Sequence, residues 1–230
     1  MSSTPLITAT AVTKVFGEGA LRTEVLKGIS LTIYEGEFIA IMGKSGAGKS
    51  TFMYQLSLLD EPTAGTITIG DTTITALSEN ERTAFRLNTL GYVFQDYALV
   101  PDLSAEENVM LPLLMRGERF PEARTIARAA IDSVGLAGKY VNTPSQLSGG
   151  EQQRMAIARA VAGKPRILFA DEPTANLDSI SGEQIIELLT TLNRESGQTI
   201  VMVTHEREYA LSADRIIHMA DGLIVNEEQP

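Results

Sequence analysis

Eight residues starting at Gly43 have the types and the spacing that bind phosphate groups. Residues 43–50 read GKSGAGKS and fit the phosphate-loop pattern G-x4-G-K-[ST]. Glycines allow backbone N–H groups to turn inward around a phosphate chain, and a following helix presents the positive end of its dipole. In this pattern Lys49 reaches the β- and γ-phosphates, and Ser50 coordinates Mg²⁺. The residues that we expect around the phosphates are Gly43, Ser45, Gly46, Ala47, Gly48, Lys49, Ser50 and Thr51.

Two carboxylates follow a short apolar strand later in the chain. Residues 167–170 are ILFA, and Asp171 and Glu172 come directly after them. At the carboxyl edge of a parallel sheet, such residues point toward the crevice where a phosphate-loop ligand binds. We expect Asp171 to face the metal ion and Glu172 to act as a general base for water. An acidic strand end that only caps the next turn is the competing interpretation, and the phosphate loop disfavours it.

The segment 147–151, LSGGE, has the features of a second phosphate site. Ser148 and Glu151 are spaced as a capping box, and two glycines leave the N–H donors of the helix start facing outward. Here the sequence resembles the ATP-binding cassette (ABC) ATPases, whose signature is LSGGQ or LSGGE. Two phosphate sites in one chain make sense if each serves an opposite face of two nucleotides, which requires a head-to-tail dimer. We therefore expect Ser148, Gly149, Gly150 and Glu151 to contact nucleotide.

The resemblance assigns five further residues. Gln95 matches a glutamine that touches Mg²⁺ or water and senses the partner, and Asp178 ends a segment, ANLD, that looks like the loop at the dimer seam. His205 matches the histidine expected on the γ-phosphate. Phe16 matches the aromatic residue that stacks on adenine, with Val25 as a second apolar wall. By the same resemblance, the catalytic residues are Glu172, His205, Lys49 and Gln95, and the metal ligands are Ser50, Gln95 and Asp171.

Other segments resemble one branch of the family. Residues 97–101, YALVP, followed by 103–109, LSAEENV, are similar to the branch that serves lipoprotein release, macrolide export and cell division. The tracts FGEG at 16–19 and EVL at 24–26 are similar to the same branch.

Hydrophobic patterns predict the elements that carry these residues. The predicted strands are 6–12, 29–41, 66–69, 167–170 and 200–203, and the predicted helices are 49–59, 79–90, 104–134 with interruptions near Pro112 and Gly117, 148–162 and 181–195. With the resemblance, this order implies an α/β fold: a P-loop NTPase (RecA-like) core with an antiparallel β subdomain and an inserted α-helical subdomain. Within one ABC ATPase domain over 1–230, we expect the core at about 36–95 and 160–225, the β subdomain strands at about 6–35 and 66–76, and the helical subdomain at about 96–150.

Composition excludes several classes of function. The chain of 230 residues has no cysteine, which excludes disulfides, thiolate metal sites and cysteine nucleophiles, and its two histidines exclude a polyhistidine metal site. His218 matches no motif and is expected to be a structural strand residue. A net charge of −10 argues against a nucleic-acid surface. Without a signal peptide or a long apolar run, the chain reads as cytoplasmic, peripheral on the inner face of the cell membrane.

These features predict an ATP hydrolase that uses ATP and Mg²⁺. The resemblance implies a homodimer formed on ATP binding and a separate integral-membrane permease as partner, with no nucleic acid expected. Through this permease, ATP hydrolysis would drive export, lipoprotein release or transmembrane force transmission. One alternative is a soluble ABC-type ATPase that acts on nucleic acid or ribosomes. Another is a plain phosphotransferase such as a small-molecule kinase, in which the LSGGE segment and His205 would have no role.

Overall fold

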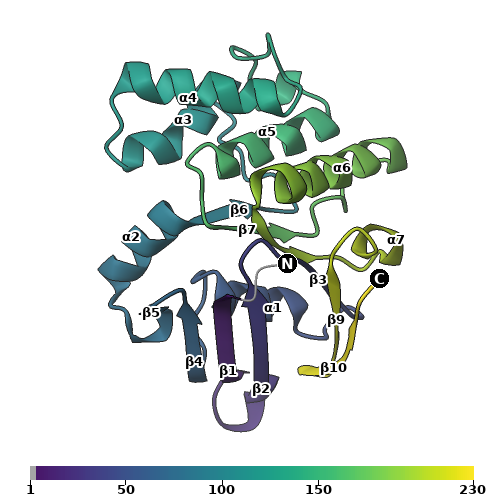
Figure 1. The fold of residues 1–230 in the computed structure, drawn as a ribbon. Coiled ribbons are helices and arrows are strands. Elements are labelled where there is room, and N and C mark those ends of the chain that lie inside the picture. The colour runs from purple at the N-terminus through teal and green to yellow at the C-terminus, as the bar shows by residue number, and fades with distance from the viewer. Residues whose placement is uncertain (1–3) are drawn as a thin grey trace. The chain divides into compact units, whose positions relative to one another are not determined.

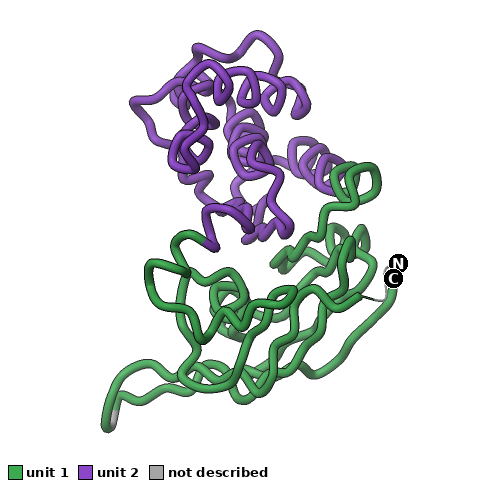
Figure 2. Tube along the Cα trace, turned by 60° about the vertical axis from the view of Figure 1, so that its left-hand side comes forward, with its two compact units in different colours: residues 1–84, 190–230 green, residues 85–189 purple. Residues whose placement is uncertain are grey.

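The computed structural model describes residues 4–230, and the chain divides into two compact units. Unit 1 contains the chain through residue 84 together with 190–230, and unit 2 contains 85–189 (Figure 2). Both boundaries fall inside helices, α2 (Glu79–Thr89) and α6 (Ser179–Ser196). The predicted three-part division of the chain stays a prediction.

An antiparallel sheet forms one part of unit 1 (Figure 1). Its order is β2 (Thr23–Tyr34), β1 (Pro5–Phe16), β4 (Ala64–Ile69) and β5 (Thr72–Thr73). Alternating residues of these strands are buried, as expected for a sheet with one face in the core. Short 3₁₀ helices follow β1 and β5, η1 (Gly19–Leu21) and η2 (Ile74–Ala76).

Parallel strands form the other sheet of unit 1. Strand β3 (Phe38–Met42) lies between β8 (Thr199–Val203) and β9 (Arg215–Ala220), and β10 (Leu223–Glu228) pairs antiparallel with β9. All residues of β3 and β8 are buried, which explains their continuous apolar sequences. Helices α1 (Lys49–Leu56) and α7 (Arg207–Ala210) contact these strands.

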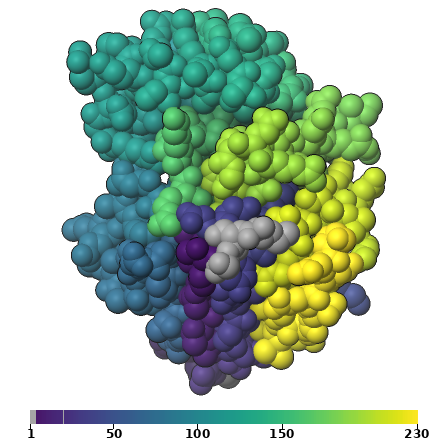
Figure 3. Space-filling view, in the orientation of Figure 1, coloured from purple at the N-terminus to yellow at the C-terminus, as the bar shows by residue number. Residues whose placement is uncertain are grey.

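The turn between β9 and β10 reaches the antiparallel sheet. The backbone N–H of Lys27 in β2 donates to the carbonyl oxygen of Gly222 at 3.0 Å. In the space-filling view the violet β2 and the yellow C-terminal strands lie side by side (Figure 3). The two sheets of unit 1 are therefore connected directly at the turn that contains Gly222.

Unit 2 combines a parallel strand pair with a group of helices. Strand β6 (Leu90–Val93) pairs with β7 (Ile167–Asp171), and α3 (Ala105–Met115), α4 (Phe120–Ser133) and α5 (Gly149–Val161) pack together. A 3₁₀ turn, η3 (Pro144–Gln146), precedes α5. The core of this unit includes Val109, Ala127, Ile131, Met155 and Phe169, all fully buried.

The structure confirms the α/β prediction and corrects three elements. The single strand predicted over 29–41 is wrong, because the chain turns at Gly36, where φ is +76°, and β2 and β3 join different sheets. The first helix ends at Leu56 rather than at 59, and Leu58 has φ +59°. The helical segment predicted over 104–134 is interrupted at Gly117 (φ +89°), as predicted, whereas the interruption predicted near Pro112 is wrong, because Pro112 lies inside α3.

Candidate functional site

The phosphate loop of unit 1 connects β3 to α1. Gly48 is the N-cap of α1, has φ +93° and offers no side-chain cap, so the first N–H groups of the helix are not used by a capping side chain. A Cβ at Gly48 would lie 3.1 Å from the carbonyl oxygen of Val25, which explains why this position has no side chain. Lys49 is 7 % exposed, and its Nζ donates to the carbonyl oxygen of Lys44 at 3.3 Å. The loop thus combines uncapped helix donors with a cation.

His205 lies at the same edge of the sheet as the phosphate loop. Because β3 and β8 are parallel and Ile41 pairs with Val203, both strands end at this edge. The N–H of Thr204 donates to the carbonyl oxygen of Ile41 at 3.2 Å, which fixes the start of the loop after β8. Thr204 is buried, whereas His205 is exposed.

Val25 lies next to the loop, and Phe16 lies on the neighbouring strand. Phe16 ends β1 and is 47 % exposed, so it is not a core residue. In the register of β1 and β2, Lys14 pairs with Leu26 and the next pair is Val15 with Glu24, which leaves Val25 as an extra residue in β2. Such a bulge redirects a strand locally, and bulges are common next to functional sites. The bulge brings Val25 to Gly48.

Unit 2 brings Gln95, Asp171 and Glu172 to one strand edge. Val93 pairs with Ala170, so the loops after β6 and β7 begin side by side. Asp171 is 6 % exposed, and Glu172 has φ +43°, a left-handed conformation that is unfavourable for a residue with a side chain. Strained backbone of this kind is frequent where a side chain has a chemical role.

The predicted capping box at the start of α5 is present. Ser148 Oγ accepts from the N–H of Glu151 at 3.3 Å, and the Glu151 carboxylate accepts from the N–H of Ser148 at 2.9 Å. The hydrogen bond from the N–H of Ser148 to this carboxylate, together with the ammonium of Lys139 at 3.2 Å, lowers the pKa of Glu151. A Cβ at Gly149 would lie 3.1 Å from the hydroxyl of Tyr97, so the glycine permits this close approach.

Helix α5 also holds the loops that follow β6 and β7. Gln153 is fully buried, and its Nε2 donates to the carbonyl oxygen of Pro173, next to Glu172, at 2.7 Å. Near the other end of the helix, Arg159 donates to the carbonyl oxygen of Tyr97 at 2.9 Å and to that of Ala98. Neither Gln153 nor Arg159 was predicted from the sequence, because their partners are distant in the chain.

Asp178 and Asn176 connect the loop after β7 to its neighbours. Asn176 Nδ2 donates to the carbonyl oxygen of Gln95 at 2.9 Å. The Asp178 carboxylate accepts from the N–H of Ser181 at 3.0 Å and from its hydroxyl at 2.8 Å, and these hydrogen bonds lower the pKa of Asp178. Asp178 therefore caps the first turn of α6 through its side chain.

The predicted residues thus fall into two sets, one in each unit. Unit 1 groups the phosphate loop, His205, Phe16 and Val25, and unit 2 groups Gln95, residues 148–151, residues 171–172 and Asp178. His218, expected to be structural, lies in β9 and its Nε2 is 3.0 Å from the Glu228 carboxylate.

The proposed metal ligands are all oxygen donors. A serine hydroxyl, a glutamine amide and a carboxylate suit Mg²⁺, which binds few protein groups and keeps water or phosphate in its other positions. Within residues 4–230, no cluster of three or more His, Cys, Asp or Glu is arranged to hold a metal ion without such help. In the same range, no helix has the length and apolar character needed to cross a membrane.

Comparisons with known sequences point to one family. The family described as "ABC transporter" matches residues 26–175. The lipoprotein-releasing system ATP-binding protein LolD of Bordetella pertussis is 46% identical over 218 residues, covering 95% of this chain and 94% of that protein. The macrolide export ATP-binding/permease protein MacB of Marinobacter nauticus is 44% identical over 227 residues, which are 99% of this chain but 35% of that protein.

Solved structures give the same result. A dimeric post-hydrolysis state of the ATP-binding cassette MJ0796, bound to ADP and Pi, has a TM-score of 0.90 and 42% identity, with 97% of this chain and 98% of that chain covered. CbiO1 from Clostridium perfringens, part of the ABC transporter complex cbiONQ, has a TM-score of 0.88 and 27% identity, with 99% and 90% covered.

Proposed function

This chain belongs to the ABC transporter family, as one of its ATP-hydrolysing cassettes, and we propose that it drives a separate membrane permease. The family match and the similar cassettes confirm the predicted resemblance, the fold class and ATP as ligand. The similarity to LolD and MacB, at 46% and 44% identity, supports export, lipoprotein release or transmembrane force transmission as the outcome.

One observation carries the proposal: the chain has a second phosphate-type helix start besides the phosphate loop. The first turn of α5 has Ser148 as cap and Gly149 and Gly150 without side chains, and Ser148 is exposed. A monomer that binds one nucleotide has no use for this second site. A head-to-tail dimer does, because the site of each copy then meets the nucleotide held by the other. The similarity to a dimeric cassette supports this arrangement.

We assign the chemistry to three side chains. Lys49 neutralises charge on the β- and γ-phosphates, and His205 donates a hydrogen bond to the γ-phosphate. Glu172 accepts a proton from the water that attacks the γ-phosphorus, so the bond to the leaving ADP oxygen breaks as the bond to water forms. The strained backbone at Glu172, with φ +43°, supports a chemical role for its side chain.

Mg²⁺ would be held by Ser50, Gln95 and Asp171, whose oxygen donors suit it. When bound, it would neutralise the charge that develops on the phosphate oxygens. Gln95 has a second role in this proposal, because its backbone carbonyl accepts from Asn176 and its loop is held by α5. A shift of this loop would therefore displace α5 through Arg159.

ATP binding and hydrolysis then drive a cycle of closing and opening. Two copies close over two nucleotides when Ser148 of each contacts the γ-phosphate held by the other. Loss of the γ-phosphate removes the contacts of Lys49, His205 and Ser148, and the dimer reopens. We propose that residues of about 96–140 contact the permease, with Gln95 as the hinge, and that the protein works at the inner face of the cell membrane.

Purification from the native host tests this function. The chain is tagged at its own locus, membranes are solubilised gently, and co-purifying proteins are identified by mass spectrometry against an untagged strain. We expect a permease of a few spans with a large extracytoplasmic domain. A soluble preparation that carries nucleic acid or ribosomes, with no permease, would contradict the transporter function and favour the soluble alternative, while leaving the ATPase assignment intact.

A further inference from the structure

Lys14 and Phe16 lie two residues apart on β1, so their side chains lie on the same side of the strand. The ammonium nitrogen of Lys14 is 5.0 Å from the centroid of the Phe16 ring. A cation at this distance is attracted to the face of an aromatic ring. One face of the ring is therefore occupied by Lys14, while 47 % of the residue remains exposed.

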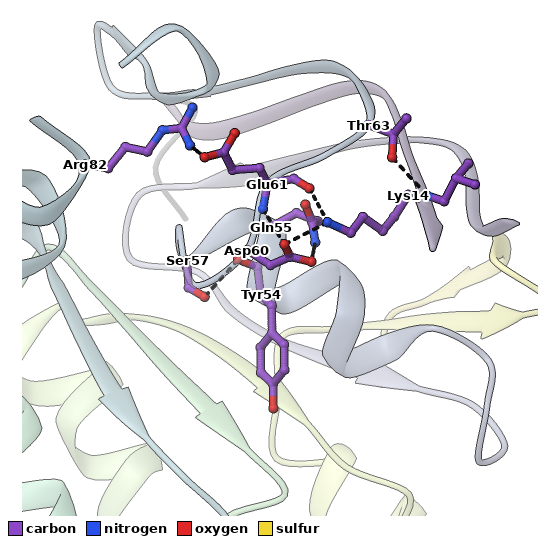
Figure 4. A network of polar contacts seen from close by, with 9 residues as sticks. Lys14, Tyr54, Gln55, Ser57, Asp60, Glu61, Thr63 and Arg82 are labelled. Carbon is purple, nitrogen blue, oxygen red and sulfur yellow. Dashed lines mark hydrogen bonds and ion pairs between the residues drawn. The ribbon is translucent and has the colours of Figure 1, made fainter. Parts of the chain in front are cut away.

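Lys14 itself is held firmly. Its Nζ donates to Asp60 Oδ1 at 2.7 Å and to the carbonyl oxygen of Glu61 at 2.6 Å, and its side chain is only 12 % exposed (Figure 4). These two hydrogen bonds use two of the three protons of the ammonium group. The cation near Phe16 is thus a fixed charge rather than a mobile surface lysine.

Asp60 connects this cation to the helix of the phosphate loop. Its second oxygen, Oδ2, accepts from Gln55 Nε2 at 3.0 Å, and Oδ1 also accepts from the N–H of Glu61 at 2.8 Å. Gln55 is 1 % exposed and lies in the last turn of α1, whose first residue is Lys49. A continuous set of contacts therefore leads from the phosphate-binding helix through Gln55, Asp60 and Lys14 to the ring of Phe16.

We propose that Lys14 is a positioning residue for the nucleotide base: it holds the Phe16 ring in the orientation that stacks on adenine. The inference rests on the proposed function, in which Phe16 contacts the base. A ring already held in place loses less conformational freedom when a ligand stacks on it, so binding is tighter. The cation on one face also favours stacking of an electron-rich base on the other face.

This role differs from simple stabilisation of the fold. If Lys14 acts on the base through Phe16, its loss weakens ligands that contain adenine and leaves ligands without a base unaffected. If Lys14 only stabilises the region around α1, its loss weakens every ligand that uses the phosphate loop. ATP and inorganic tripolyphosphate, measured side by side, separate these two roles.

The experiment measures the Kd of ATP and of tripolyphosphate by calorimetry. For Lys14→Met we expect ATP binding about three- to fivefold weaker, the size of one cation–ring contact, with tripolyphosphate binding unchanged. Phe16→Ala should weaken ATP by about fivefold or more. In Lys14→Met/Phe16→Ala the loss should equal that of Phe16→Ala alone, because Lys14 acts through the ring.

Two further variants test the same role of Lys14 if Lys14→Met does not fold. Lys14→Arg keeps a cation near the ring and should keep ATP binding within about twofold of wild type. Asp60→Asn weakens the ion pair that holds the Lys14 ammonium in place. It should weaken ATP binding less than Lys14→Met does and should again leave tripolyphosphate binding unchanged.

The possible results distinguish a failure of the proposed role of Lys14 from a failure of the proposed contact between Phe16 and the base. Unchanged ATP binding in Phe16→Ala would remove Phe16 from the base site, and the inference would fall with it. A loss in Phe16→Ala with none in Lys14→Met, or equal losses for ATP and tripolyphosphate in Lys14→Met or Asp60→Asn, would overturn the inference alone.

Discussion

Arg159 donates a hydrogen bond from Nη2 to the carbonyl oxygen of Tyr97 at 2.9 Å, and Nη1 bonds the carbonyl oxygen of Ala98. Both acceptors have left-handed backbone, with φ +64° and +48°. Helix α5 begins at the second phosphate site, and Arg159 in its last turn fixes the loop after Gln95. This arrangement gives α5 a role in positioning that its sequence motif alone does not reveal.

Replacing Arg159 tests this contact. Burial lowers the pKa of Arg159, because the charged guanidinium is partly removed from water. We expect Arg159→Met to lower the free energy of unfolding by about 1–3 kcal/mol, because two backbone carbonyl groups lose hydrogen bonds from a charged donor, and to slow ATP hydrolysis. Urea unfolding and steady-state hydrolysis measure the two effects.

The matched control is Arg154→Met on the same helix. Arg154 makes an exposed hydrogen bond to Gln184 at 3.2 Å, so its loss should change the free energy of unfolding by less than about 0.5 kcal/mol. Equal effects of the two substitutions would show that the contact of Arg159 with the loop has no special role.

Lys139 balances the charge of Glu151 at the second phosphate site. Its ammonium lies 3.2 Å from a carboxylate that would otherwise repel phosphate. We expect Lys139→Met to weaken ATP-dependent dimer formation, measured by sedimentation, and expect the same substitution to have much less effect in a Glu151→Gln background. Equal effects of Lys139→Met in both backgrounds would contradict the prediction that Lys139 acts through Glu151.

Three capping glutamates predict how stability depends on pH. Hydrogen bonds from Ser78, Ser104 and Ser148 lower the pKa values of Glu81, Glu107 and Glu151 from the ordinary 4.5. Because these carboxylates are more acidic in the folded state, their stabilisation is complete above pH 4.5 and is lost as pH falls through the lowered values. We expect the urea midpoint to fall as pH decreases below about 4.5.

Single substitutions test whether the capping glutamates cause the loss of stability at low pH. Glu107→Gln removes one of the titrating groups, so its urea midpoint should fall less steeply with pH than that of wild type. Glu187→Gln, at an exposed position of α6, serves as control and should follow the wild type. A Glu107→Gln midpoint that tracks the wild type through the acid range would rule out this cause.

Ser148→Arg tests the second phosphate site directly. A long cation at the helix start should block dimer formation, while a single copy still binds ATP through the phosphate loop. Ser145→Arg adds the same charge at an exposed position three residues earlier and should leave dimer formation intact. Dimers of normal stability in Ser148→Arg would show that the start of α5 does not face a nucleotide.

Local patterns explain why much of the site was predictable. The phosphate loop, the capping box at Ser148 and the apolar strands before Asp171 and His205 depend on residues close in sequence, and the structure has them where the sequence predicts. The break at Gly36 was missed because apolar residues continue through 29–41 on both sides of it, and only the tertiary structure places the two halves in different sheets.

Contacts between distant residues could not be predicted. Lys14 and Asp60 are 46 residues apart, and Arg159 and Ala98 are 61 apart. Nothing in a single sequence pairs such residues. Lys14 did carry a weak signal, because a residue two positions before Phe16 on a strand shares its face.

In the proposed function, two copies close over ATP and Glu172 starts hydrolysis. Glu172→Gln keeps the shape of the side chain and removes the base. Sedimentation of this variant with MgATP and with MgADP, beside an assay of phosphate release, measures dimer formation and hydrolysis. We expect hydrolysis slowed by about 100-fold or more, dimers with MgATP and monomers with MgADP. Hydrolysis at the wild-type rate, or monomers under both conditions, would contradict it.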